Sequence, residues 1–141
     1  MIVRAAQIRS LKENYEAQGN SIVLLYGRDG CEKEGMLRLY LQDKKHFYYR
    51  ARQASSLEQY RQMAAEVEKT YDVKLQKGTY NEIFNRVKSG DASKLVVVID
   101  EFQYIVKKDP EFMDSIIKLK EKKLYPGPVQ IILTSSDVAW V

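Results

Sequence analysis

The sequence predicts an α/β fold built on a parallel β-sheet with helices on both faces. Two observations lead to this class. Segments with helical spacing alternate with short apolar segments, and two of the latter, "SIVLLY" at 21–26 and "KLVVVIDEF" at 94–102, show no polar alternation. Such continuous apolar strands are typical of parallel sheets, in which both faces are covered. The chain has 141 residues, 45% of them hydrophobic, which is enough for one domain with a sizeable core.

The first third of the chain is predicted to contain two helices and two strands. Ile8, Leu11 and Tyr15 recur at helical spacing, and Gly19 is suited to end that helix. The strand at 21–26 has no polar alternation and is therefore expected to be covered on both faces. In chain order, the expected elements are a helix at about 4–18, a strand at 21–26, a helix that carries Met36 and ends near Asp43, and a strand at 46–51.

The remaining two thirds continue the alternation. Ser55 or Ser56 is expected to cap one helix, and Thr79 with Glu82 to form a capping box at the start of the next. The run "YPGP" at 125–128 is a turn. The expected elements are helices at about 55–70 and 79–89, a strand at 94–102, a helix opened by Asp109 and Pro110, and a last strand at 129–136.

The turn after the first strand has part of a phosphate-loop pattern. Such a loop needs a strand, a tight turn with inward N–H groups and a helix N-terminus, commonly with the spacing G-x-x-x-x-G-K-[ST]. Gly27 and Lys33 have the required separation, whereas Glu32 and Glu34 stand where the pattern has a glycine and a hydroxyl residue. The pattern predicts ATP with Mg²⁺ as the ligand. The candidate binding residues are Gly27, Arg28, Asp29, Gly30, Cys31, Lys33 and Glu34.

Two later strands end in polar residues. The strand at 94–102 leads into Asp100 and Glu101, in the form of a Walker B segment, in which the aspartate holds Mg²⁺ through water and the glutamate activates the attacking water. Asp100 is expected to contribute nothing to core packing. Ser135, in the last strand, is placed to sense the outer phosphate. Because ligands bind at the carboxyl ends of strands in open α/β sheets, we predict that these segments form one nucleotide site.

Together, these motifs resemble those of the prokaryotic AAA/STAND-like P-loop ATPases, over nearly the whole chain. The matching segments are "LLYGR" at 24–28, Lys33, "FYYRA" at 47–51, "IDEFQY" at 99–104 and "IILTSS" at 131–136. The resemblance implies the additional-strand, catalytic-glutamate type of fold, in which the last strand lies between the phosphate-loop strand and the Walker B strand. It also implies Asp100 for Mg²⁺, Glu101 as general base and Lys33 on the phosphates.

The glutamates in the loop predict weak or absent nucleotide binding and hydrolysis. One carboxylate about 4 Å from a phosphate charge costs roughly 4 kcal/mol at an effective dielectric of 20. Lys33 is expected to pair with Glu34 or Asp100, and an alternative is that Glu34 ligates Mg²⁺ directly. The carboxylates of Glu34, Asp100 and Glu101 are expected to converge on this lysine, so that a divalent cation alone binds more readily than ATP. The open alternative is a pseudo-ATPase that serves as a scaffold for protein–protein interaction.

The composition argues against other classes of function. The net charge of +4 is spread over 23 basic and 19 acidic residues, so nucleic-acid binding through "KLKEKK" at 118–123 is not expected. Cys31 is the single cysteine, which rules out an internal disulfide. No apolar run approaches the roughly 18 residues of a membrane helix, and the first residues do not form a signal peptide. A cytoplasmic protein without a membrane partner is expected.

The extent of the chain leads to one further expectation. Residues 1–141 are expected to form a single domain, an N-terminal fragment of a longer ATPase that stops after the sensor strand. In the family's strand order, 21–26 would then be an edge strand with unpaired backbone groups. We therefore predict self-association, or binding of a protein partner, through 21–26.

Overall fold

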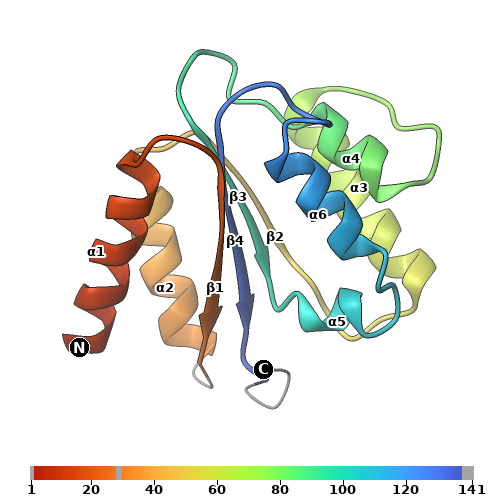
Figure 1. Cartoon of the computed structure of the whole chain (residues 1–141). Helices are drawn as coiled ribbons and strands as arrows, with labels where there is room; N and C mark the ends of the chain where they lie inside the picture. Colours follow the sequence, from red (N-terminus) through yellow and green to blue (C-terminus); the bar gives the residue numbers. More distant parts are fainter. Residues whose placement is uncertain (1, 28–29, 138–141) are drawn as a thin grey trace.

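The computed structural model has a four-stranded, all-parallel sheet with helices on both sides (Figure 1). It describes residues 2–27 and 30–137, and for residues 2–8 and 30–32 it describes the backbone alone. The strands are β1 (Ser21–Tyr26), β2 (His46–Arg50), β3 (Leu95–Asp100) and β4 (Val129–Ser135). The helices are α1 (Ile2–Glu16), α2 (Gly30–Leu41), α3 (Ser56–Tyr71), α4 (Tyr80–Arg86), α5 (Gln103–Val106) and α6 (Phe112–Lys120). The predicted α/β class is confirmed.

The strand order is β1-β4-β3-β2, so that the last strand in sequence lies between the first and the third. In register, Leu24 of β1 pairs with Leu133 of β4, and Val97 of β3 pairs with Ile131 of β4. The order implied by the family resemblance is confirmed. Because all strands run the same way, their carboxyl ends meet at one edge of the sheet, which is the edge at which open α/β sheets bind ligands.

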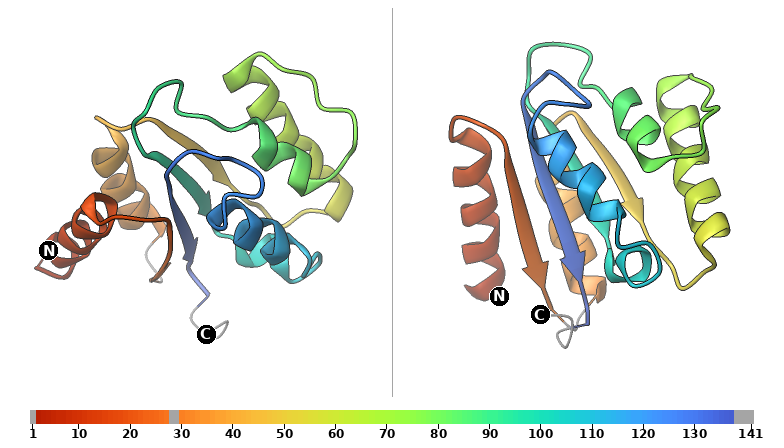
Figure 2. Two further views of the ribbon diagram at one scale, coloured as in Figure 1. Left: turned by 45° about the horizontal axis from the view of Figure 1, so that its top comes forward. Right: turned by 45° about the vertical axis from the view of Figure 1, so that its right-hand side comes forward.

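The helices form one layer on each face of the sheet. Figures 1 and 2 show α1 and α2 against one face, and α3, α4 and α6 against the other. In the smaller core, Leu11 of α1 and Leu37 of α2 pack with Val98 of β3. The larger core lies on the other face and includes Phe84 of α4 and Phe112 of α6, neither of which has measurable exposure. β3 is thus covered on both faces, which explains its uninterrupted apolar sequence.

β1 is not covered on both faces, and this prediction is wrong. Val23 and Leu25 pack toward α1 and α2, but Leu24, on the opposite face, is 46% exposed. Figure 1 shows α3, α4 and α6 mainly over the other strands, and Ile22 of β1 is only partly buried against the larger core. An apolar run favours a strand, but it carries no information on how far the helices of one layer extend.

Local sequence signals place the starts of α3 and α4 correctly. Ser55 and Thr79 accept backbone N–H groups of the first helical turns, as predicted. The predicted capping box is incomplete, however, because the Glu82 carboxylate accepts the N–H groups of Gln76 and Lys77 at 2.8 and 2.7 Å. This carboxylate therefore orders the loop before α4 instead of the cap itself.

Some boundaries differ from the sequence prediction. α4 ends at Arg86, because Val87 is extended (φ −70°, ψ 146°), and the helix predicted from Asp109 and Pro110 begins at Phe112. The four-residue α5 is not predicted, since it is too short for helical periodicity. In the described part of the chain, no helix is long and apolar enough to cross a membrane.

Candidate functional site

Three segments meet at the carboxyl edge of the sheet, as predicted. The N–H of Gly27, directly after β1, donates to the carbonyl oxygen of Ser135 at the end of β4 (3.1 Å). The N–H of Glu101, directly after β3, donates to Oγ1 of Thr134 (3.1 Å). These bonds hold the first residue of the loop and the residue after β3 against the same central strand.

Lys33 lies in the first turn of α2, with its side chain folded back toward the start of the loop. The residue is only 8% exposed. Its Nζ donates to the carbonyl oxygen of Gly27 (3.4 Å) and lies 3.5 Å from Oε1 of Glu101. The predicted pairing of Lys33 with Glu34 or Asp100 is therefore wrong. The chain turns at Glu101, so this carboxylate is the one that reaches the lysine.

Glu101 is held in place through both its backbone and its carboxylate. Its φ of 59° lies in the left-handed region, which is uncommon for residues other than glycine. Oε1 accepts the N–H of Ser136 (2.8 Å), and Oε2 accepts its hydroxyl (2.6 Å). Burial raises the pKa of Glu101, but the hydrogen bonds from Ser136 and the charge of Lys33 outweigh burial, so that the pKa lies below its ordinary value. The carboxylate is consequently charged at neutral pH.

Asp100 is buried, with 2% exposure, and both its oxygens accept hydrogen bonds. Oδ2 accepts the hydroxyl of Tyr48 on β2 (2.5 Å), and Oδ1 accepts the hydroxyl of Thr134 on β4. Burial and the bond to Asp100 raise the pKa of Tyr48, which keeps its hydroxyl protonated. The expectation that Asp100 contributes nothing to packing is wrong, since this carboxylate links three neighbouring strands.

Glu34 points to two arginines and not to Lys33. Its Oε1 accepts Nη2 of Arg38, one turn further along α2 (2.7 Å), and its Oε2 accepts Nη1 of Arg50 at the end of β2 (3.0 Å). The predicted convergence of three carboxylates on Lys33 is therefore wrong. The second basic partner neutralises the charge that Glu34 adds at the hydroxyl position of the loop pattern.

The two serines at the end of β4, Ser135 and Ser136, contact different residues. Ser135, the predicted site residue, is completely buried. The Ser135 hydroxyl accepts the N–H of Asp137 (3.1 Å) and donates to the carbonyl oxygen of Asp137 (3.3 Å). Ser136 instead provides both hydrogen bonds to Glu101. Successive side chains point in opposite directions at the end of a strand, so only one serine of the pair reaches the carboxylate.

Four predicted loop residues cannot be compared with the site in full. Arg28 and Asp29 lie outside the described residues. Gly30 and Cys31 begin α2, and the side chains of Cys31 and Glu32 are outside the described part of the structure.

The sequence does not predict Tyr48, Arg50, Thr134 or Ser136 as site residues. Arg50 pairs in register with Asp100, and Thr134 precedes the serine pair directly. For Arg50, Thr134 and Ser136 the available signal was a position at or next to a strand end, but the strand order is needed to know which ends are neighbours. Tyr48 lies in the middle of β2, so strand-end position did not indicate it.

The geometry fits a phosphate group better than a directly bound metal. Lys33 lies in the first turn of α2, where a helix N-terminus and an ammonium group together suit an anion, although Glu101 already pairs with this lysine. The charged carboxylate of Glu101 can accept a proton from water. Within the described residues, no group of three acidic, histidine or cysteine side chains is placed to hold a metal ion. Asp100 accepts a hydrogen bond from within the protein at each of its two oxygens.

No protein-family model matches the chain. A protein of Methanocaldococcus jannaschii described as uncharacterized is 21% identical over 136 residues, which are 96% of this chain and 29% of that protein. The chain thus spans less than a third of the length of that relative.

Solved structures give the fold. The ORC1 protein of Aeropyrum pernix in complex with DNA has a TM-score of 0.63 and 23% identity, over 98% of this chain and 40% of that chain. The Walker-type ATPase of Pyrococcus abyssi has a TM-score of 0.63 and 20% identity, over 96% of this chain and 45% of that chain. This chain therefore spans less than half of each structure, and it has the α/β fold of P-loop ATPase domains.

Proposed function

We propose that this chain is an AAA-type P-loop ATPase domain with a degenerate phosphate loop, which binds and hydrolyses ATP weakly or not at all. The observation that carries the proposal is the buried pair of Lys33 and Glu101. The lysine that would bind the outer phosphates is already neutralised by the residue that would act as general base.

The energetic argument concerns this pair. At 3.5 Å, the attraction between the two charges is on the order of 5 kcal/mol at an effective dielectric of 20. A phosphate group that binds Lys33 must compete with Glu101 for this lysine. The phosphate also approaches a loop that carries Glu32. Since Ser136 holds Glu101 with two hydrogen bonds, the carboxylate does not move aside freely.

The roles of the residues follow from their positions. Lys33 would bind the outer phosphates, Asp100 would orient a metal-bound water, and Glu101 would accept a proton from the attacking water. Mg²⁺, when bound, would supply neutralisation of the phosphate charge. Arg38 and Arg50 hold Glu34 away from the phosphates.

Calorimetry with ATP and Mg²⁺ tests the proposal. We expect the wild-type chain to bind more weakly than micromolar. Glu101→Gln releases Lys33 and should tighten binding about tenfold or more, because it removes the competing charge. Glu66→Gln, an exposed glutamate of α3, is the control and should leave the affinity unchanged. Submicromolar binding by the wild type would contradict the degenerate loop.

A second candidate is a scaffold for a protein partner. It is favoured by the edge position of β1 and by the exposed Leu24. The triple variant Glu32→Gly, Glu34→Thr and Glu101→Gln separates the two functions. If it binds ATP, these three glutamates account for the weak binding of the wild-type chain. If it remains unable to bind, the scaffold is the better description.

A further inference from the structure

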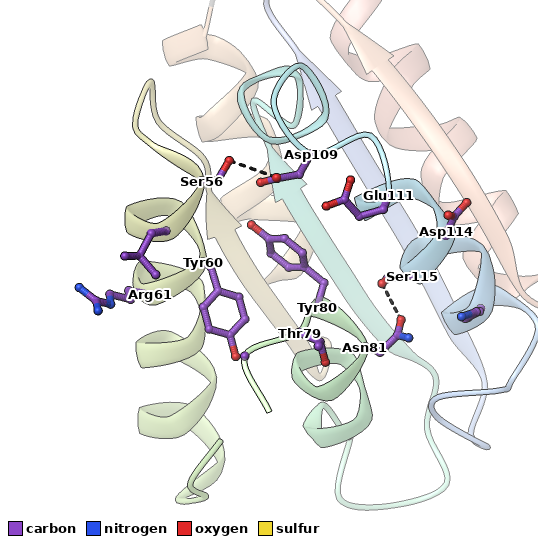
Figure 3. Close-up of a pocket in the computed structure, with 13 residues that line it drawn as sticks. Ser56, Tyr60, Arg61, Thr79, Tyr80, Asn81, Asp109, Glu111, Asp114 and Ser115 are labelled. Carbon is purple, nitrogen blue, oxygen red and sulfur yellow. Dashed lines mark hydrogen bonds between the residues drawn. The ribbon is translucent and has the colours of Figure 1, made fainter. Parts of the chain in front are cut away.

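A cavity of about 560 Å³ lies among α3, α4 and α6 (Figure 3). Its walls come from the first half of α3, the start of α4 and the segment from Asp109 to Lys118. None of the residues at the carboxyl edge of the sheet contributes to it. The volume lies within the roughly 300–1,000 Å³ that small-molecule sites usually have.

One wall of this cavity carries three carboxylates: Asp109, Glu111 and Asp114. Among the described residues, none of the three forms an ion pair, and the one hydrogen bond from another side chain is that of the Ser56 hydroxyl to Asp109 Oδ1 (3.1 Å). Arg61 and Lys118 also line the cavity, but neither pairs with these acids, and Figure 3 shows the Arg61 guanidinium pointing away from them. The wall therefore presents negative charge that the described part of the protein does not compensate.

The opposite wall is aromatic and contains an unsatisfied hydroxyl. Tyr60 and Tyr80 pack edge to face, with ring centroids 5.6 Å apart. The hydroxyl oxygen of Tyr80 is buried and has no hydrogen-bond partner among the described residues. Figure 3 shows this hydroxyl directed toward Asp109 and Ser56. Burial raises the pKa of Tyr80, and the charge of Asp109 raises it further, so the hydroxyl stays neutral. A buried polar group without a partner is costly, and a bound donor would remove that cost.

We propose that this cavity binds an aliphatic ammonium or guanidinium group, the chemistry shared by free polyamines and by lysine and arginine side chains. The N–H groups of such a cation can donate to Asp109 and Glu111 and to the hydroxyl oxygen of Tyr80. Its apolar stem fits beside the tyrosine rings, where cations are also attracted to the ring face. A bare metal ion fits less well, because no three of these acids are placed to hold one. An anion would meet uncompensated carboxylates.

The test uses the whole chain and two probes. Spermidine represents the free amine, and the peptide acetyl-Gly-Arg-Gly-amide represents a basic side chain, with acetyl-Gly-Gln-Gly-amide as its neutral control. Binding is followed by calorimetry and by NMR shifts of the backbone amides of Tyr80 and Asn81. We expect one-to-one binding of at least one cation and none of the neutral peptide. The tighter probe identifies the source of the group.

Three variants show whether the site is the proposed one. Asp109→Asn with Glu111→Gln should weaken binding about tenfold or more, whereas Glu66→Gln, an exposed acid of α3 outside the cavity, should not. Tyr80→Phe should weaken binding without lowering the melting temperature, since the lost hydroxyl has no partner in the protein. The proposal is overturned if neither cation shifts these amides, or if all variants bind as the wild type does.

Discussion

β1 and β3 have similar sequences but different surroundings. Both are six-residue apolar strands in the same parallel sheet. Every residue of β3 is buried, and Leu95 has no exposure. Among the described strands, β1 pairs only with β4, and Leu24 is 46% exposed. The comparison shows that the position in the strand order, and not the apolar sequence, decides how much a strand contributes to the core.

The ends of the two strands differ in the same way. β3 ends at Asp100 and is followed by Glu101. The Asp100 carboxylate accepts hydrogen bonds from Tyr48 of β2 and Thr134 of β4, and the Glu101 carboxylate accepts one from the hydroxyl of Ser136. β1 leads into Gly27, which has one backbone bond to β4 and begins the loop.

The largest effect is expected from matched leucine substitutions in the two strands. Leu95→Ala in β3 should reduce the free energy of unfolding by about 2–5 kcal/mol, because it leaves a cavity in the core. Leu24→Ala in β1 should cost roughly 1 kcal/mol or less, since that side chain is half exposed already. Urea denaturation measures both. Equal losses would show that β1 is as well packed as β3.

A smaller effect is expected at the end of β3. Asp100→Asn replaces an acceptor of the Tyr48 and Thr134 hydroxyls by an amide that offers only one oxygen. We expect a loss of about 1–3 kcal/mol in the free energy of unfolding, with an unchanged far-UV circular dichroism spectrum. Tyr48→Phe, which removes one of the two bonds, should cost less. An unaltered unfolding midpoint for Asp100→Asn would mean that the network does not stabilise the strand end.

The edge of β1 should affect association more than stability. We propose that the chain self-associates through 21–26, because the strand combines the exposed Leu24 with an edge that no other described strand covers. Leu24→Lys should lower the concentration-dependent mass seen by sedimentation, while Leu39→Lys, at an exposed position on α2, serves as the control. A wild-type chain that stays at 16.4 kDa at high concentration would contradict this proposal.

The smallest effect concerns pH at the end of β3. The folded-state pKa of Glu101 lies below the ordinary value of 4.5, so its contribution to stability is complete above that pH and is lost as the pH falls through the folded pKa. Glu101→Gln should therefore flatten the decline in melting temperature below about pH 4.5. An identical decline in wild type and variant would show that the bonds from Ser136 do not favour the charged form.

Much of the fold could be predicted from local patterns. The two long apolar strands, the caps at Ser55 and Thr79 and the alternation of elements depend on residues close in sequence. The arrival of Lys33, Asp100 and Glu101 at one edge could also be predicted, because parallel strands bring their carboxyl ends together. The partners of these side chains could not, since each partner comes from a segment distant in sequence.

By itself, the sequence determined the α/β class, the strand segments and the polar residues that end them, because periodicity and strand-end composition are local properties. Only the tertiary structure decided that Lys33 forms an ion pair with Glu101 and that Arg50 forms one with Glu34. It also decided that Leu24 remains exposed. These outcomes depend on the turn at Glu101, on the register of β2 with β3 and on the reach of the helices over the sheet. Each is a relation between segments far apart in the chain, so no single stretch of sequence contains it.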